Sequence, residues 1–281
     1  MGNLAEDNYT NCTIKVTDAA GNESSPLTIT SFEVDTDAPT LAEVTAVTSP
    51  TNDQTPNYSF SSTQAGTITY AGSCSSSTSS VTASDNITIS LKGSDSNPLA
   101  QDNYSDCTIT VTDNASNPVT MGIRRFEIDT TRPTVTSTSP SNTDNNSSVS
   151  SSISVTFSEP MDNISTNTNT SCDKTLQLSS NNFGACIQMS SSTPSSSDNR
   201  TFTLDPSDNL SFDTTYKIKV TTGARDLAGN NLASDNTTAT GFETRFWTMQ
   251  LGTSSAEEGR GVCLLYTSDS ADEEDSVDLG G

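Results

Sequence analysis

Carboxylates make up almost all of the side chains in this chain that could do chemistry. The 281 residues include 35 Asp and Glu but no His, so the commonest general base and a frequent metal ligand are both missing. Glu159 and Asp162 flank Pro160 and Met161, and a paired-carboxylate glycosidase can be imagined from them. A turn motif at the end of a strand is the favoured interpretation. No Gly-x-Ser-x-Gly motif, phosphate loop or dinucleotide fingerprint occurs either, so we expect no catalytic residue, no cofactor-binding residue and no enzymatic activity.

Two Asp residues at a predicted joint between domains, Asp35 and Asp37, are the candidate metal ligands. Carboxylate oxygens are hard ligands of the kind that Ca²⁺ binds, and Asp18 is nearby in the sequence. A second joint keeps Asp129 but has Thr131 where the second Asp would be, and the spacing does not fit the EF-hand loop. Solvated turn carboxylates are therefore the favoured alternative. We expect no cofactor, with Ca²⁺ at the joints as the candidate ion.

The elements that position these residues are predicted to be strands. Apolar residues alternate with Thr, Ser and Lys in several short segments, as expected for a strand with one buried face. Clusters of Ser, Asn, Asp, Gly and Pro separate these segments, as turns require, and no stretch of comparable length has a helical period. The clearest alternating segments are Cys12–Val16, Ile153–Phe157, Thr201–Leu204 and Tyr216–Val220. The sequence predicts an all-β fold.

Composition narrows the class of partner. The formal net charge is −23 and only 12 Lys and Arg occur, so the clustered cations that phosphate contacts need are missing and we expect no nucleic-acid partner. No run of apolar residues is long enough to span a membrane. Hydrophobic residues make up 30% of the chain, which is below the usual apolar share, so each core is expected to be thin.

An internal repeat organises the first half of the chain. The segment Leu4–Asp18 returns with few changes as Leu99–Asp113, and Phe32 and Pro39 return as Phe126 and Pro133. The number of residues from the start of one copy to the start of the next matches the length of one complete β-sandwich domain, about 100 residues. Position Met1 then corresponds to the inside of a domain, so we expect the chain to begin in mid-sandwich and Met1 not to be the biological start.

The repeat indicates how the cysteines pair. Cys12 is the counterpart of Cys107, so if Cys107 pairs with Cys74 inside the complete copy, the partner of Cys12 lies upstream of the chain. Cys263 lies in the end of the chain that resembles translated adapter, so Cys172 and Cys186 are then left to pair with each other. The alternative is buried, reduced cysteine in a cytosolic protein. Disulfides would place the chain outside the cytoplasm, at the cell surface or in the extracellular medium.

The motifs at the domain ends resemble known families. The segments Val16–Asn22 and Asp35–Pro39 are similar to the closing strands and linker of bacterial Ig-like repeats from large surface proteins, although residues 113–117 lack the turn Gly of residues 18–22. Three later segments resemble the Ig-like domain first described in bacterial surface-layer proteins: Ile153–Met161, Thr215–Thr221 and Asp226–Asn230. The resemblance implies tandem Ig-like β-sandwich domains, truncated at both ends.

The last 35 residues contain two segments that resemble other known sequences. Residues Trp247–Val262 are similar to the opening of a bacterial β-propeller repeat, although Trp247 could instead close the preceding sandwich. Residues Cys263–Gly281 resemble translated sequencing-library adapter, for which an acidic, disordered tail is the alternative. The predicted division is 1–37 for a carboxyl-terminal remnant of an Ig-like repeat, 38–132 for a complete repeat, 133–247 for the surface-layer-type domain, 248–262 for a first propeller strand and 263–281 for an artefact.

These observations predict a spacer or stalk segment of a large secreted or surface-anchored bacterial protein. The alternatives are an adhesin whose Ig-like domains bind carbohydrate or protein directly, and an accessory region of a secreted hydrolase. The expected partners are neighbouring domains of the same chain and a protein or glycan that the sequence does not identify.

Overall fold

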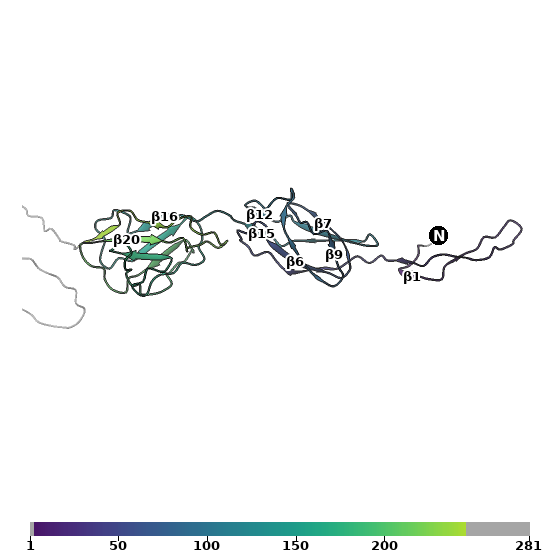
Figure 1. The fold of residues 1–281 in the computed structure, drawn as a ribbon, viewed down its shortest axis with the longest axis horizontal. Helices are drawn as coiled ribbons and strands as arrows, with labels where there is room; N and C mark the ends of the chain where they lie inside the picture. The colour runs from purple at the N-terminus through teal and green to yellow at the C-terminus, as the bar shows by residue number, and fades with distance from the viewer. Residues whose placement is uncertain (1–2, 246–281) are drawn as a thin grey trace, which may run out of the picture. The chain divides into compact units, whose positions relative to one another are not determined.

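The structure is a computed structural model that describes residues 3–245. These residues form strands and loops without a helix, so no helix among them could cross a bilayer. Two clusters of buried apolar side chains define two β-sandwiches, which we call the first sandwich (core residues Val47 to Ile128) and the second sandwich (core residues Ile153 to Phe242) (Figure 1). The propeller-like segment 248–262 and the adapter-like segment 263–281 lie outside the described residues.

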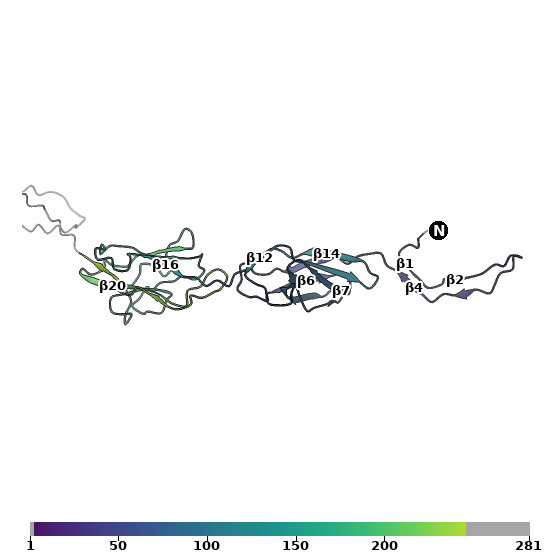
Figure 2. The same ribbon diagram turned by 90° about the horizontal axis from the view of Figure 1, so that it is seen from above.

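Residues 3–37 form two nested antiparallel strand pairs, which we call the amino-terminal hairpins. The outer pair is β1 with β4 and the inner pair is β2 with β3. Their bounds are Asp7–Tyr9 for β1, Thr13–Ile14 for β2, Leu27–Thr28 for β3 and Phe32–Val34 for β4. Figure 2 shows β1, β2 and β4 as a single layer of backbone without a facing sheet.

The first sandwich contains a three-stranded sheet in the order β10-β6-β5 and a four-stranded sheet in the order β14-β13-β7-β9. Tyr58 and Phe60 on β6 point into the same core as Ile109 and Val111 on β13, and all four are fully buried. Two short pairs, β12 with β15 and β8 with β11, complete the sandwich. The strands are β5 Leu41–Thr45, β6 Asn57–Ser62, β7 Gly66–Ala71, β8 Cys74–Ser75, β9 Ser80–Val81, β10 Asn86–Ser90, β11 Lys92–Gly93, β12 Asp102–Tyr104, β13 Thr108–Asp113, β14 Pro118–Gly122 and β15 Phe126–Ile128.

The second sandwich has the same two-layer construction. One sheet runs β16-β17-β19, and the other runs β18-β20-β21, with β22 also paired to β20. Phe157 on β17 meets Phe202 on β19 edge to face at 5.9 Å, and Tyr216 on β20 stacks on Phe242 of β22 at 5.7 Å. The strands are β16 Val135–Ser139, β17 Ile153–Phe157, β18 Leu176–Ser179, β19 Thr201–Leu204, β20 Thr214–Val220, β21 Asn236–Thr237 and β22 Phe242–Thr244.

The repeated sequence folds the same way in both places. Asp7 opposes Val34 and Tyr9 opposes Phe32 in the amino-terminal hairpins, as Asp102 opposes Ile128 and Tyr104 opposes Phe126 in the first sandwich. Each Tyr stacks on its Phe at 5.2 Å, and each hydroxyl donates to a carbonyl four residues earlier, on Ala5 or Ala100. The local sequence therefore specifies this arrangement, because it forms with and without a covering sheet.

Two disulfides cross-link the sandwiches. Cys74 bonds to Cys107 in the first sandwich, across 33 residues, and Cys172 bonds to Cys186 in the second, across 14. By the chain-entropy model, loops of these sizes stabilise a fold by about 4 and about 3 kcal/mol. Cys12, the counterpart of Cys107, is a free thiol in the described residues.

Candidate functional site

An Asp-x-x-x-Asn hairpin occurs three times, at Asp18–Asn22, Asp113–Asn117 and Asp226–Asn230. In each copy one carboxylate oxygen of the Asp accepts the backbone N–H of the Asn, and the other accepts its side-chain amide, over 2.8 to 3.0 Å. The side-chain amide of Asn22 and the backbone N–H of Asn117 are the main causes that lower the pKa of Asp18 and Asp113. The hairpin Asp is thus a structural carboxylate that holds the turn closed.

The hairpin Asn also holds the linker that leads into its sandwich. The Asn117 side chain donates to the backbone carbonyl of Asp35 over 3.1 Å, and the Asn230 side chain donates to the backbone carbonyl of Asp129 over 2.8 Å. Asp35 and Asp129 occupy the same place in the repeated sequence, just before Pro39 and Pro133. Sequence reasoning singled out the linker Asp residues but missed this contact. The Asp-x-x-x-Asn spacing did not reveal it, because the same spacing also occurs outside the hairpins, at Asp7–Asn11, Asp53–Asn57 and Asp205–Asn209.

Each joint also contains a residue that lies just after the second strand of its sandwich, β6 or β17. The backbone N–H groups of Thr63 and Ser158 donate to the carbonyls of Thr40 and Thr134, and their hydroxyls accept the N–H of those same residues in return. These matched contacts align the two positions that follow, Gln64 and Glu159. We therefore define the first joint as Asp35, Gln64, Asp113 and Asn117, and the second joint as Asp129, Glu159, Asp226 and Asn230.

The second joint brings three carboxylates together. Oxygen atoms of Asp129, Glu159 and Asp226 all lie within 4.8 Å of one another, and Asp226 is buried. Burial is the largest cause that raises the pKa of Glu159 to about 7, followed by the negative charges of Asp129 and Asp226 and a hydrogen bond with Asp129, while Arg200 opposes them. Such a trio can share a proton, and its oxygen ligands are of the type that suits a divalent cation.

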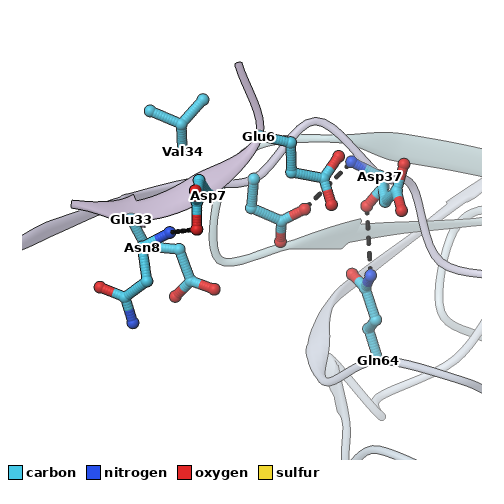
Figure 3. Close-up of a pocket in the computed structure, with 8 residues that line it drawn as sticks. Glu6, Asp7, Asn8, Glu33, Val34, Asp37 and Gln64 are labelled. Atoms are coloured by element: carbon cyan, nitrogen blue, oxygen red, sulfur yellow. Dashed lines mark hydrogen bonds between the residues drawn. The ribbon is translucent and has the colours of Figure 1, made fainter. Parts of the chain in front are cut away.

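The residues singled out as Ca²⁺ ligands lie in the first joint and its surroundings. Figure 3 shows Asp37 close to Glu6 and Gln64, in a hollow that Glu33 and Asp35 also line. Asp35 accepts the backbone N–H of Asp37 over 3.0 Å, and Gln64 donates to the Asp37 carbonyl over 3.2 Å. In the described part of the chain, the only trio of carboxylates with oxygens this close is the one in the second joint. Asp35 and Asp37 therefore lack a third carboxylate at that distance, and Asp18 is engaged in its own hairpin.

The two carboxylates considered for glycosidase chemistry have separate partners. Asp162 forms an ion pair with Arg225 over 2.9 Å, whereas Glu159 faces Asp129 and Asp226. Glu159 thus lies beside the linker residue Asp129, and Asp162 belongs to a separate ion pair.

Comparison with known proteins agrees with the fold. Residues 129–248 match the family described as bacterial Ig-like domain, a span that begins at the linker residue Asp129 and contains the core of the second sandwich. No curated protein matches the chain. The predicted fold class, an all-β Ig-like sandwich, is therefore confirmed.

Proposed function

We propose that this chain is a structural spacer of a bacterial surface or secreted protein, in which Ig-like sandwiches are held in series by repeated joints. The observation that carries the proposal is the linker contact made by Asn117 and again by Asn230. The same hydrogen bond at the same repeat position fixes the linker to the sandwich that follows it. A linker held in this way limits rotation between neighbouring modules, which is what a spacer needs and a flexible tether does not.

Two further observations support this role. Each sandwich carries its own disulfide, and disulfides persist in oxidising compartments outside the cytoplasm. The large apolar side chains exposed on the sandwiches, Val44, Phe212 and Leu227, are few and come from separate segments. Scattered exposed apolar residues are normal for a protein surface and do not mark a binding face. The described residues therefore favour the spacer over an adhesin that binds its ligand through the sandwiches.

The test is the distribution of distances between one spin label on each sandwich, measured by electron–electron double resonance on the full chain. We expect a narrow distribution that broadens in N230A, because that variant removes the hydrogen bond to the Asp129 carbonyl. The matched control is N22A. It removes the equivalent side-chain hydrogen bond to Asp18 within the first hairpin and leaves the hydrogen bonds to both linkers in place. A wild-type distribution as broad as that of N230A would contradict the proposal.

A further inference from the structure

The amino-terminal hairpins expose apolar side chains that their counterparts in the first sandwich bury. Ile14 and Val16 are 49% and 65% exposed, whereas their counterparts Ile109 and Val111 are 0% exposed. Leu4 is likewise exposed and its counterpart Leu99 is fully buried. Because the strand register and the Tyr–Phe stack agree between the two copies, the difference lies in what covers this face and not in the hairpins themselves.

The first sandwich shows what covers such a face. Tyr58 and Phe60 on β6 and Ile89 on β10 are fully buried in one cluster with Ile109 and Val111. Strand β7 also pairs with β13, along the edge that β14 does not occupy. Among the described residues β2 pairs only with β3. The covering segment is thus the first half of the repeat, residues 41–93, which supplies both a facing sheet and an edge strand.

The cysteines give a second, independent sign of the same partner. Cys107 is bonded to Cys74, which lies on β8 in the covering half. Cys12 occupies the position of Cys107 and is a free thiol. A covering segment of the same type would bring a cysteine to Cys12.

We propose that the amino-terminal hairpins are an interaction surface for a polypeptide segment of the same kind as residues 41–93, which completes an Ig-like sandwich and forms a disulfide with Cys12. The partner carries alternating aromatic and aliphatic residues in the places of Tyr58, Phe60 and Ile89, and a cysteine in the place of Cys74. A second copy of this chain is not the partner. In every copy that half is already packed on residues 99–128 and linked through Cys74 to Cys107.

The test uses residues 38–97 of this chain as the probe, with Cys74 carried as a mixed disulfide with glutathione. It is added to the full chain bearing Cys263→Ser, so that Cys12 is the one cysteine outside the two disulfides. The Cys12 thiolate of the full chain attacks the Cys74 sulfur of the probe. A disulfide forms between these two sulfurs, and glutathione leaves as the thiolate and takes up a proton. No external oxidant is needed, and mass spectrometry follows the linked product.

The matched control is the same chain with Ile14→Asp and Val16→Asp. Both positions are exposed, so the substitutions leave the uncovered hairpins intact while preventing the apolar face from being buried. We expect the unsubstituted chain to form the linked product about tenfold faster or more, because packing raises the effective concentration of the two sulfurs. Hydrogen exchange on a C12S/C263S chain should also show slower exchange at Ile14 and Val16 when the probe is added.

Two results would overturn the proposal. Equal rates for the two chains would mean that Cys12 reacts as an ordinary exposed thiol without docking. A chain that dimerises alone and already protects Ile14 and Val16 from exchange would mean that a second copy covers the face.

Discussion

Replacing Glu159 with Gln should remove a pH dependence from the stability of the second sandwich. Its pKa rises from 4.5 to about 7 in the folded protein, chiefly through burial and then through the charges of Asp129 and Asp226. A pKa that is higher in the folded state stabilises the fold at low pH, and this stabilisation is lost as the pH rises through the folded value. The relevant window therefore lies between about pH 4.5 and about pH 7.

The size of the effect follows from the shift. A rise from 4.5 to about 7 corresponds to about 3.5 kcal/mol at most, since one pKa unit is about 1.4 kcal/mol. Glu159 keeps some contact with solvent, which screens its charge and reduces the expected effect to about 1 to 2 kcal/mol. The first joint shows that the replacement is tolerated, because Gln64 occupies the same position there.

The assay is calorimetric unfolding of the full chain and the E159Q variant at several pH values from about 4.5 to about 7.5. A chelator is present so that no cation replaces the shared proton. We expect equal midpoints for the second sandwich at the acid end and a higher midpoint for E159Q at the alkaline end, by about 4 to 8 °C. The reciprocal variant Q64E should create a loss of stability with rising pH in the first sandwich. A constant difference between E159Q and wild type at every pH would refute the reasoning.

Two further predictions concern the first sandwich. Replacing Cys74 and Cys107 together by Ser should lower its free energy of unfolding by about 4 kcal/mol, measured by urea denaturation, and a loss below about 1 kcal/mol would contradict the entropic estimate. Replacing Ser116 by Gly should stabilise the same sandwich by about 1 kcal/mol, because Ser116 has a φ of 75° where the equivalent hairpin has Gly229 with a φ of 95°. The same denaturation experiment checks it, and an unchanged or lower midpoint for S116G would show that this conformation costs nothing.

Several features of the fold could be predicted from the residues alone. Alternating apolar positions marked Ile153–Phe157 and Tyr216–Val220 as strands. The first is strand β17 and the second lies within β20, and the apolar residues of both are buried. The repeat also carried structural information beyond its length, because Tyr9 and Tyr104 make the same stack and the same hydrogen bond. These features depend on residues within one hairpin or on which face of a strand a residue occupies, so the sequence of that segment specifies them.

The candidate site was harder to predict. Asp129 was recognised as a joint residue, and Glu159 and Asp226 were recognised as parts of motifs, but nothing in the sequence indicated that the three lie together. Each comes from a different part of the chain, and only the packing of the linker against the end of β17 and the third Asp-x-x-x-Asn hairpin places their oxygens within 4.8 Å.

The sequence by itself thus determined the strands, the repeat and the types of side chain at the joints. The tertiary structure decided which of those side chains act on one another. The exposed Ile14 and buried Ile109 have nearly the same sequence around them, yet only one is covered, because burial depends on a sheet contributed by distant residues. The shifted pKa of Glu159 has the same origin, since desolvation and neighbouring charge arise only when separate segments fold against each other.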